Sequence, residues 1–463
     1  MDKINEHGHW WLPGQKDASV SGQIEYTPKE GVKLELVDSL LDKDSEPNEF
    51  FTNPSSNKLP RIHGYLSNQK YATVENPLRV SQDWSPENQS VSETYRSTRV
   101  FIGDNIEGGE RYSRLQIKNQ KILKWANESV VDSVLDTESV ALEEINDRKI
   151  EQLVAVLEPY SYDAELNDCT VSLKFSISGE YSTYSTNLNT DGYIQIRCPE
   201  PERFDELWDR MVEVMSYISL SIGDGLYPEE ILVYDEDLCE GISVYQQFDN
   251  ISKAYNPTKL DYLFQPDEEN FEKTLIEYLN HRESAPTFHE KLSQILYGPD
   301  LIPSLEFLTI VIALEAYHDN KYADRQILED SEFERFRQEV MDATPENPDI
   351  ENQMRGLLNN VINQPSLKSK LEVVVEEDCP PLSKLIETDS VLTEARDRRH
   401  DIAHGLQSID QQEITRLSQK LRLIVDAIVL TEMGIDEGRI IQSLAERYQA
   451  ILAESPFAES TSG

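Results

Sequence analysis

The spacing of apolar residues changes once along this chain, near Asn256-Pro257-Thr258. Before this point, apolar and polar residues alternate, as in residues 21–26 and 32–37, and this period is typical of half-buried β-strands. After it, apolar residues recur every three or four positions, which indicates amphipathic helices. The pattern predicts an α+β protein with a β-rich domain over residues 1–262, a helical bundle over 263–455 and a disordered polar tail over 456–463.

The first domain is expected to be a sandwich-like, antiparallel arrangement or two packed sheets. Residues 29–31 fit a hairpin turn between its first two strands, and an amphipathic helix with Phe204, Trp208 and Met215 on its apolar face interrupts the strand pattern. Trp10 and Trp11 are expected to cover the sheet, with a binding role as the alternative. Further strands are predicted at residues 61–66, 95–102, 112–118, 171–177, 193–197, 231–234 and 242–247.

Two helices of the second domain carry a charge on the apolar stripe that is expected to face the core. Glu315 continues the run Leu301, Leu305, Leu308 and Ile312, and Arg399 lies between Ala395 and Ile402, while Ile414, Leu417, Leu421, Ile424 and Ile428 form an uncharged stripe. Because a buried charge is costly unless it is paired, Arg399 is predicted to pair with Glu315. The pair either fixes the register of the two helices or holds the guanidinium so that it can bind a phosphate.

Two histidines follow at a spacing of four, so His400 and His404 share a helix face, and Gly405 suits the end of that helix. Each histidine could be an ordinary solvated residue, and His404 could be a cation that the helix C-terminus favours. A histidine beside an arginine is also a suitable general acid or base for phosphodiester cleavage. RNA supplies its own 2′-OH nucleophile, so that reaction needs no metal and no cofactor.

Zinc is the competing interpretation, because His400-Asp401-Ile402-Ala403-His404 is close to the H-E-x-x-H helix of zinc proteases. Asp401 is shorter than the usual glutamate base, Gly405 ends the helix, and no third ligand follows at a family spacing. The sequence therefore favours a site without metal.

The charge balance is strongly acidic, with 86 acidic against 43 basic residues and a formal net charge of −43. Such a surface suits a halophile, because at about 1 M salt the Debye length falls to about 3 Å and self-repulsion is screened. The plainer alternative is an acidic protein that its charge keeps in solution. Either way the chain lacks the basic surface of a general nucleic-acid binder, so any RNA chemistry requires a small local site.

The remaining signals favour a cytoplasmic protein. The cysteines at positions 169, 198, 239 and 379 are scattered and form no C-x-x-C pair, which argues against a disulfide framework and a structural zinc site. No run of about 18 apolar residues occurs, which argues against a membrane span, and the first residues do not resemble a secretory signal.

The segment Arg399-His400-x-x-x-His404 resembles the R-[polar]-x-x-x-H motif of HEPN domains, which are helical RNases that often act as dimers. Residues 313–318 resemble the early HEPN helix with its acidic residue, and 421–435 resemble the last long helix and its turn. The resemblance implies that Arg399 stabilises the scissile phosphate, His404 is the general acid/base, His400 is a polar auxiliary and Glu315 orients Arg399. The products would be a 2′,3′-cyclic phosphate and a 5′-hydroxyl.

Residues 8–13, 20–22, 34–36 and 115–125 resemble the N-terminal domain of ApeA proteins, which are prokaryotic antiphage defence factors. This resemblance implies abortive infection, with the N-terminal domain sensing a phage component such as a protein and the HEPN domain cutting host RNA, for which tRNA is a candidate. Arg399 and His404 are five residues apart, or about 140° around a straight helix. One chain would aim both at one phosphate only if the helix loosened before Gly405, so a homodimer with a composite site is expected.

Overall fold

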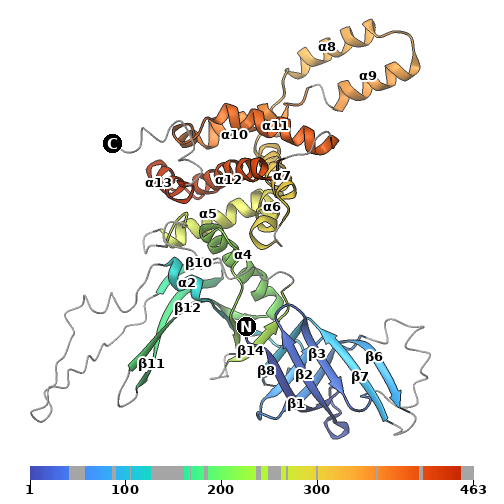
Figure 1. Cartoon of the computed structure of the whole chain (residues 1–463), viewed down its shortest axis with the longest axis vertical. Helices are drawn as coiled ribbons and strands as arrows, with labels where there is room; N and C mark the ends of the chain where they lie inside the picture. Colours follow the sequence, from blue (N-terminus) through green and yellow to red (C-terminus); the bar gives the residue numbers. More distant parts are fainter. Residues whose placement is uncertain are drawn as a thin grey trace, which may run out of the picture. The chain divides into compact units, whose positions relative to one another are not determined.

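The computed structural model describes residues 1–40, 58–85, 90–104, 106–126, 161–166, 168–181, 186–235, 241–248, 262–266, 270–298, 301–360, 363–405 and 410–449 (Figure 1). The point where the periodicity changes and the predicted tail lie outside these residues. The chain divides into two compact units between Ile276 and Glu277. The first unit consists mainly of strands and the second of helices, as the spacing of apolar residues predicts.

The strands of the first unit form one 14-stranded sheet in the order β10-β11-β12-β9-β13-β14-β8-β5-β4-β1-β2-β3-β7-β6. Every neighbouring pair is antiparallel. The strands are β1 (Ile4–Trp11), β2 (Val20–Thr27), β3 (Gly31–Leu36), β4 (Arg61–Leu66), β5 (Tyr71–Glu75), β6 (Leu78–Ser85), β7 (Ser90–Ser97), β8 (Arg99–Gly103), β9 (Tyr112–Lys118), β10 (Ser161–Leu166), β11 (Cys169–Tyr181), β12 (Thr186–Glu202), β13 (Glu230–Tyr234) and β14 (Ile242–Gln246).

The antiparallel β-rich domain is thus confirmed, and the strands differ from the prediction in detail. Residues 95–102 contain the end of β7 and the start of β8 rather than one strand, and β1, β5, β6 and β10 were not anticipated. The strands belong to a single hydrogen-bonded sheet rather than to two separate sheets, and side chains from β1 to β5 and from β7 and β8 share one core. Trp10 is fully buried in that core and Trp11 is buried too, which supports their predicted packing role.

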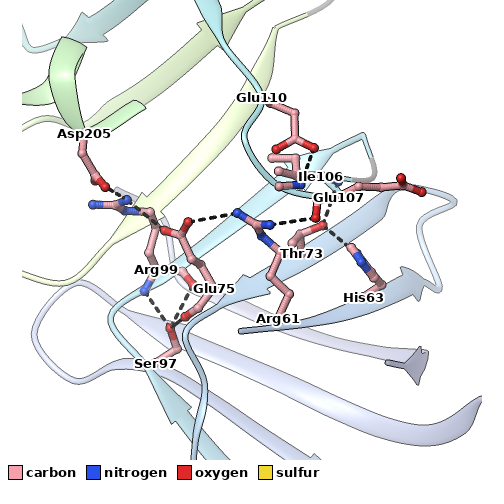
Figure 2. A network of polar contacts seen from close by, with 11 residues as sticks. Arg61, His63, Thr73, Glu75, Ser97, Arg99, Ile106, Glu107, Glu110 and Asp205 are labelled. Carbon is pink, nitrogen blue, oxygen red and sulfur yellow. Dashed lines mark hydrogen bonds and ion pairs between the residues drawn. The ribbon is translucent and has the colours of Figure 1, made fainter. Parts of the chain in front are cut away.

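Polar side chains tie the middle of this sheet to helix α4 (Phe204–Ile222), as Figure 2 shows. Arg99 Nη1 donates to Glu75 at 2.9 Å and to Asp205, in the first turn of α4, at 2.8 Å. Arg61 shares Glu75 at 3.6 Å and donates to the carbonyl of Glu107 at 2.8 Å. The half-buried Glu75 therefore links β4, β5 and β8 and, through Arg99, holds the N-terminus of α4 against the sheet.

One expectation is wrong: Cys169 and Cys198 form a disulfide. They are 29 residues apart, but the antiparallel register of β11 and β12 pairs Thr170 with Arg197 and so brings the two cysteines together. Spacing along the chain does not reveal this pairing, because it depends on the register of a long hairpin.

The second unit is a helical bundle around α12 (Gln411–Glu432), most of whose side chains are buried. Helices α7, α10, α11 and α13 pack against α12, and α6 packs on α7. The other helices are α5 (Phe271–Ser284, across the division between the units), α6 (Pro286–Tyr297), α7 (Pro303–Lys321), α8 (Asp330–Ala343), α9 (Pro348–Asn360), α10 (Leu367–Asp378), α11 (Thr388–His404) and α13 (Glu437–Arg447). Among the residues that the structure describes, no helix is both long and apolar enough to cross a membrane.

Two buried histidines join α5 to α6. The Nε2 atom of His289 lies 3.0 Å from the Nδ1 atom of His281, within hydrogen-bond distance. Burial, together with the neighbouring His281, lowers the pKa of His289 to about 2, and burial lowers the pKa of His281 as well. Both side chains are therefore neutral in the folded protein at ordinary pH.

This pair predicts a loss of stability in mild acid. Each histidine binds a proton near pH 6.5 in the unfolded chain but only at lower pH in the folded chain. The free energy of unfolding therefore has its full value above about pH 6.5 and decreases as the pH falls below that value. His289 should contribute a slope of up to about 1.4 kcal/mol per pH unit between about pH 6.5 and 5, above the range in which most carboxylates titrate, and His281 should contribute in the same direction. Denaturant unfolding of His289→Gln should show a shallower pH slope, whereas the exposed control His7→Gln should keep the parental one. An unchanged slope in His289→Gln would contradict the assignment.

Candidate active site

The candidate site lies at the C-terminal end of α11. Val391, Leu392 and Ala395 bury the first half of this helix in the bundle. The helix ends at Gly405, whose left-handed φ of 62° favours a residue without a side chain, and whose N–H donates to the carbonyls of Asp401 and Ile402. The last turns of α11 therefore leave the core and place their side chains at the surface.

Arg399 and Glu315 make the predicted contact, with Arg399 Nη2 donating to Glu315 Oε2 at 3.0 Å. Their predicted burial is wrong, because the Arg399 side chain is 45% exposed and that of Glu315 is 21% exposed. The face of α11 that is buried in the first half of the helix no longer lies in the core at Arg399, and even Ile402 is only half-buried. A guanidinium carries five N–H donors, so Arg399 has donors besides the one bonded to Glu315 with which it could reach a ligand from the exposed side.

The apolar stripe of α7 that was predicted to lead to Glu315 within the core also lies outside the core. The helix buries Phe307, Ile310, Val311 and Leu314, whereas Leu305 and Ile312 are exposed. Since α7 is apolar on nearly every side, the spacing of its apolar residues could not tell the inner stripe from the outer one. Exposed Ile302 extends the outer stripe, so an apolar strip of α7 runs along the surface toward Glu315.

His400 and His404 are exposed and lie side by side, with ring centroids 4.4 Å apart. The helix stays α-helical through His404, so it does not loosen before Gly405. At about 100° per residue, Arg399 and His404 leave the helix about 140° apart, whereas His400 is only about 40° from His404. Within one chain the histidines therefore share a face that Arg399 does not.

Other charges near the site already have carboxylate partners. Arg398 donates to Glu413, in the first turn of α12, at 2.7 Å and to Asp401 at 3.5 Å. Arg396 binds the neighbouring Asp397 at 2.7 Å. Asp401, the residue that would be the base in the zinc interpretation, thus contacts Arg398. Among the described residues, the group of three side chains that could hold a metal ion is Cys169, Cys198 and Glu202, and it includes neither histidine.

Comparison with known families agrees with this architecture. The profile of ApeA N-terminal domain 1 matches residues 5–278, and that of the Apea-like HEPN domain matches residues 308–439. The first match alone covers more than half of the chain, so the chain belongs to the ApeA family, as the sequence motifs predicted. The HEPN match contains all four candidate site residues, Glu315, Arg399, His400 and His404. Neither the curated proteins nor the solved structures contain a significant match.

The exposure of the Arg399–Glu315 pair predicts a small contribution to stability. Exposed pairs contribute about 0–1 kcal/mol, whereas breaking a buried pair costs about 3–5 kcal/mol. A double-mutant cycle with Arg399→Ala and Glu315→Ala, measured by denaturant unfolding, should therefore give a coupling energy below about 1 kcal/mol. A coupling of several kcal/mol would mean that the pair is a structural element of the core.

Proposed function

We propose that this protein is a metal-independent endoribonuclease that acts in antiphage defence by abortive infection. The observation that carries the proposal is the end of α11, where an exposed Arg399 held by Glu315 and two exposed histidines occur on different faces of the same last turns, within an Apea-like HEPN match. ApeA N-terminal and HEPN domains together suggest an antiphage HEPN nuclease.

In the proposed mechanism, His404 takes the proton of the RNA 2′-OH, whose oxygen attacks the adjacent phosphorus. Arg399 binds the non-bridging phosphate oxygens and stabilises the charge that develops on them. The bond to the 5′ oxygen breaks, that oxygen receives a proton from His404 acting as general acid, and the products are a 2′,3′-cyclic phosphate and a 5′-hydroxyl. Glu315 orients Arg399, and His400 is a polar auxiliary beside His404.

A homodimer would solve the geometric problem of this site. Arg399 and His404 point in directions about 140° apart on one helix, but a two-fold axis can bring Arg399 of one protomer toward His404 of its partner. An exposed apolar strip supports this arrangement, because it runs to the Arg399–Glu315 pair and suits a self-complementary contact; it consists of Leu305 and Ile312 on α7 and of Ile302 just before the helix.

The other parts of the proposal concern the substrate, the trigger and the cellular setting. The N-terminal domain would sense a phage component, and the substrate would be cytoplasmic RNA, with tRNA as one candidate. The charge of −43 would repel RNA at low salt, so the site is expected to work in a high-salt cytoplasm, where the repulsion is screened.

The alternative function is a non-catalytic HEPN scaffold or nucleotide-binding module. One observation favours it: the Arg399–Glu315 pair joins α11 to α7 and could be purely structural. RNA cleavage by the purified protein distinguishes the two functions.

The nuclease proposal predicts cleavage that survives chelation. The full-length protein at about 1 M salt with EDTA should cut RNA and leave 2′,3′-cyclic phosphate ends, because no metal takes part. His404→Ala and Arg399→Ala should each lower the rate about 100-fold or more, since proton transfer and charge stabilisation each contribute on that scale. Arg416→Ala removes an exposed arginine of the same domain, on α12, and should cut like the parent.

Three outcomes would count against the proposal. Variants that cut as fast as the parent would refute the assigned roles of Arg399 and His404. Activity that disappears only on chelation would favour zinc. A parent that binds nucleotides but cuts no RNA, alone or with phage-infected lysate, would favour the scaffold.

A further inference from the structure

A second cluster of chemically reactive side chains lies in the β-rich unit, far along the chain from the candidate nuclease residues. Cys169 begins β11 and Cys198 lies near the end of β12, where the strand register makes them direct neighbours. Both are buried and form a disulfide. Glu202 ends β12, and one of its carboxylate oxygens and the two sulfur atoms all lie within 4.8 Å of one another.

The carboxylate of Glu202 is only half satisfied. Its Oε1 atom accepts a hydrogen bond from Arg210 Nη2 on α4 at 2.8 Å. Its Oε2 atom is buried and has no hydrogen-bond partner among the residues that the structure describes. A buried carboxylate oxygen without a partner is unfavourable, and the same carboxylate lies beside the two sulfur atoms.

We propose that, when the disulfide is reduced, Cys169, Cys198 and Glu202 bind a thiophilic divalent cation such as Zn²⁺. Reduction by a dithiol transfers two electrons to the S–S bond and two protons to the sulfurs, and the dithiol becomes a disulfide. Each thiol then releases its proton as the cation binds. The disulfide and the metal-bound state exclude each other, so the redox state of the cysteines controls whether the site exists.

The ligands and their charges suit this cation. Zinc takes thiolate sulfur at about 2.3 Å and carboxylate oxygen at about 2.0–2.2 Å. Tetrahedral geometry puts two sulfurs about 3.8 Å apart, so the sulfurs that are bonded in this structure would separate to that distance after reduction. Two thiolates and a carboxylate carry three negative charges, which the cation and the neighbouring Arg210 neutralise. Arg210, which also contacts Asp168 at 3.4 Å, would hold the carboxylate in place from outside the coordination sphere. A fourth position would remain for water.

The test uses the full-length protein, reduced, stripped of metal and titrated anaerobically with Co²⁺ and then Zn²⁺. The reduced protein should bind one tight equivalent and show thiolate-to-cobalt charge-transfer absorption, which Zn²⁺ removes by displacement. Cys198→Ser should lose that absorption. Glu202→Gln should keep it but bind zinc at least about 10-fold more weakly, whereas Glu200→Gln, an exposed control on the same strand, should bind like the parent.

These measurements distinguish loss of the metal site from misfolding and from non-specific metal binding. Glu202→Gln keeps both cysteines and nearly the shape of the side chain, so it tests the site even if Cys198→Ser fails to fold. Weak binding to surface carboxylates gives no thiolate absorption. Reduced protein without that absorption, or Glu202→Gln with parental zinc affinity, would overturn the proposal, as would equal tight binding by the oxidised protein.

Discussion

The regular α-helical geometry of α11 up to its glycine stop is the constraint on which the candidate site depends. Because the helix continues to His404 and ends at Gly405, the direction of every side chain in its last turns is set by about 100° per residue. The two histidines therefore share a face, and Arg399 faces elsewhere. Glu315 on α7 meets Arg399 on that other face, so the candidate site falls into two parts, the Arg399–Glu315 pair and the two histidines.

Charge explains why such a site would be small and exposed. With twice as many acidic as basic residues, the chain as a whole would repel RNA. A local arginine can still bind a phosphate if its donors face solvent, and the exposed Arg399 meets this condition while Glu315 restrains it. Neighbouring Arg396 and Arg398 also contact nearby carboxylates, so the positive charge of all three arginines is balanced locally and Arg399 differs from the other two in its place beside Glu315.

Hydropathy patterns predicted the class of each domain and many individual elements, because period two and period 3.6 reflect one-sided burial. They failed where burial is not one-sided. On α7, apolar residues surround the helix, and the stripe that ends at Glu315 proved to be the exposed one. On α11, the stripe reaches Arg399 only after the helix has left the core. Hydropathy patterns also do not predict contacts between distant segments. The register of β11 and β12, and not sequence spacing, joins Cys169 to Cys198.

If Arg399 and His404 of different protomers complete each other, as proposed, then mixing two inactive variants should restore activity. Arg399→Ala and His404→Ala would be purified, mixed in equal amounts under conditions that exchange subunits, and assayed for RNA cleavage. If the site is composite, half of the dimers are mixed and each has one intact site, so the mixture should recover about a quarter of the parental activity. A mixture as inactive as its components, although subunits have exchanged, would contradict the composite site.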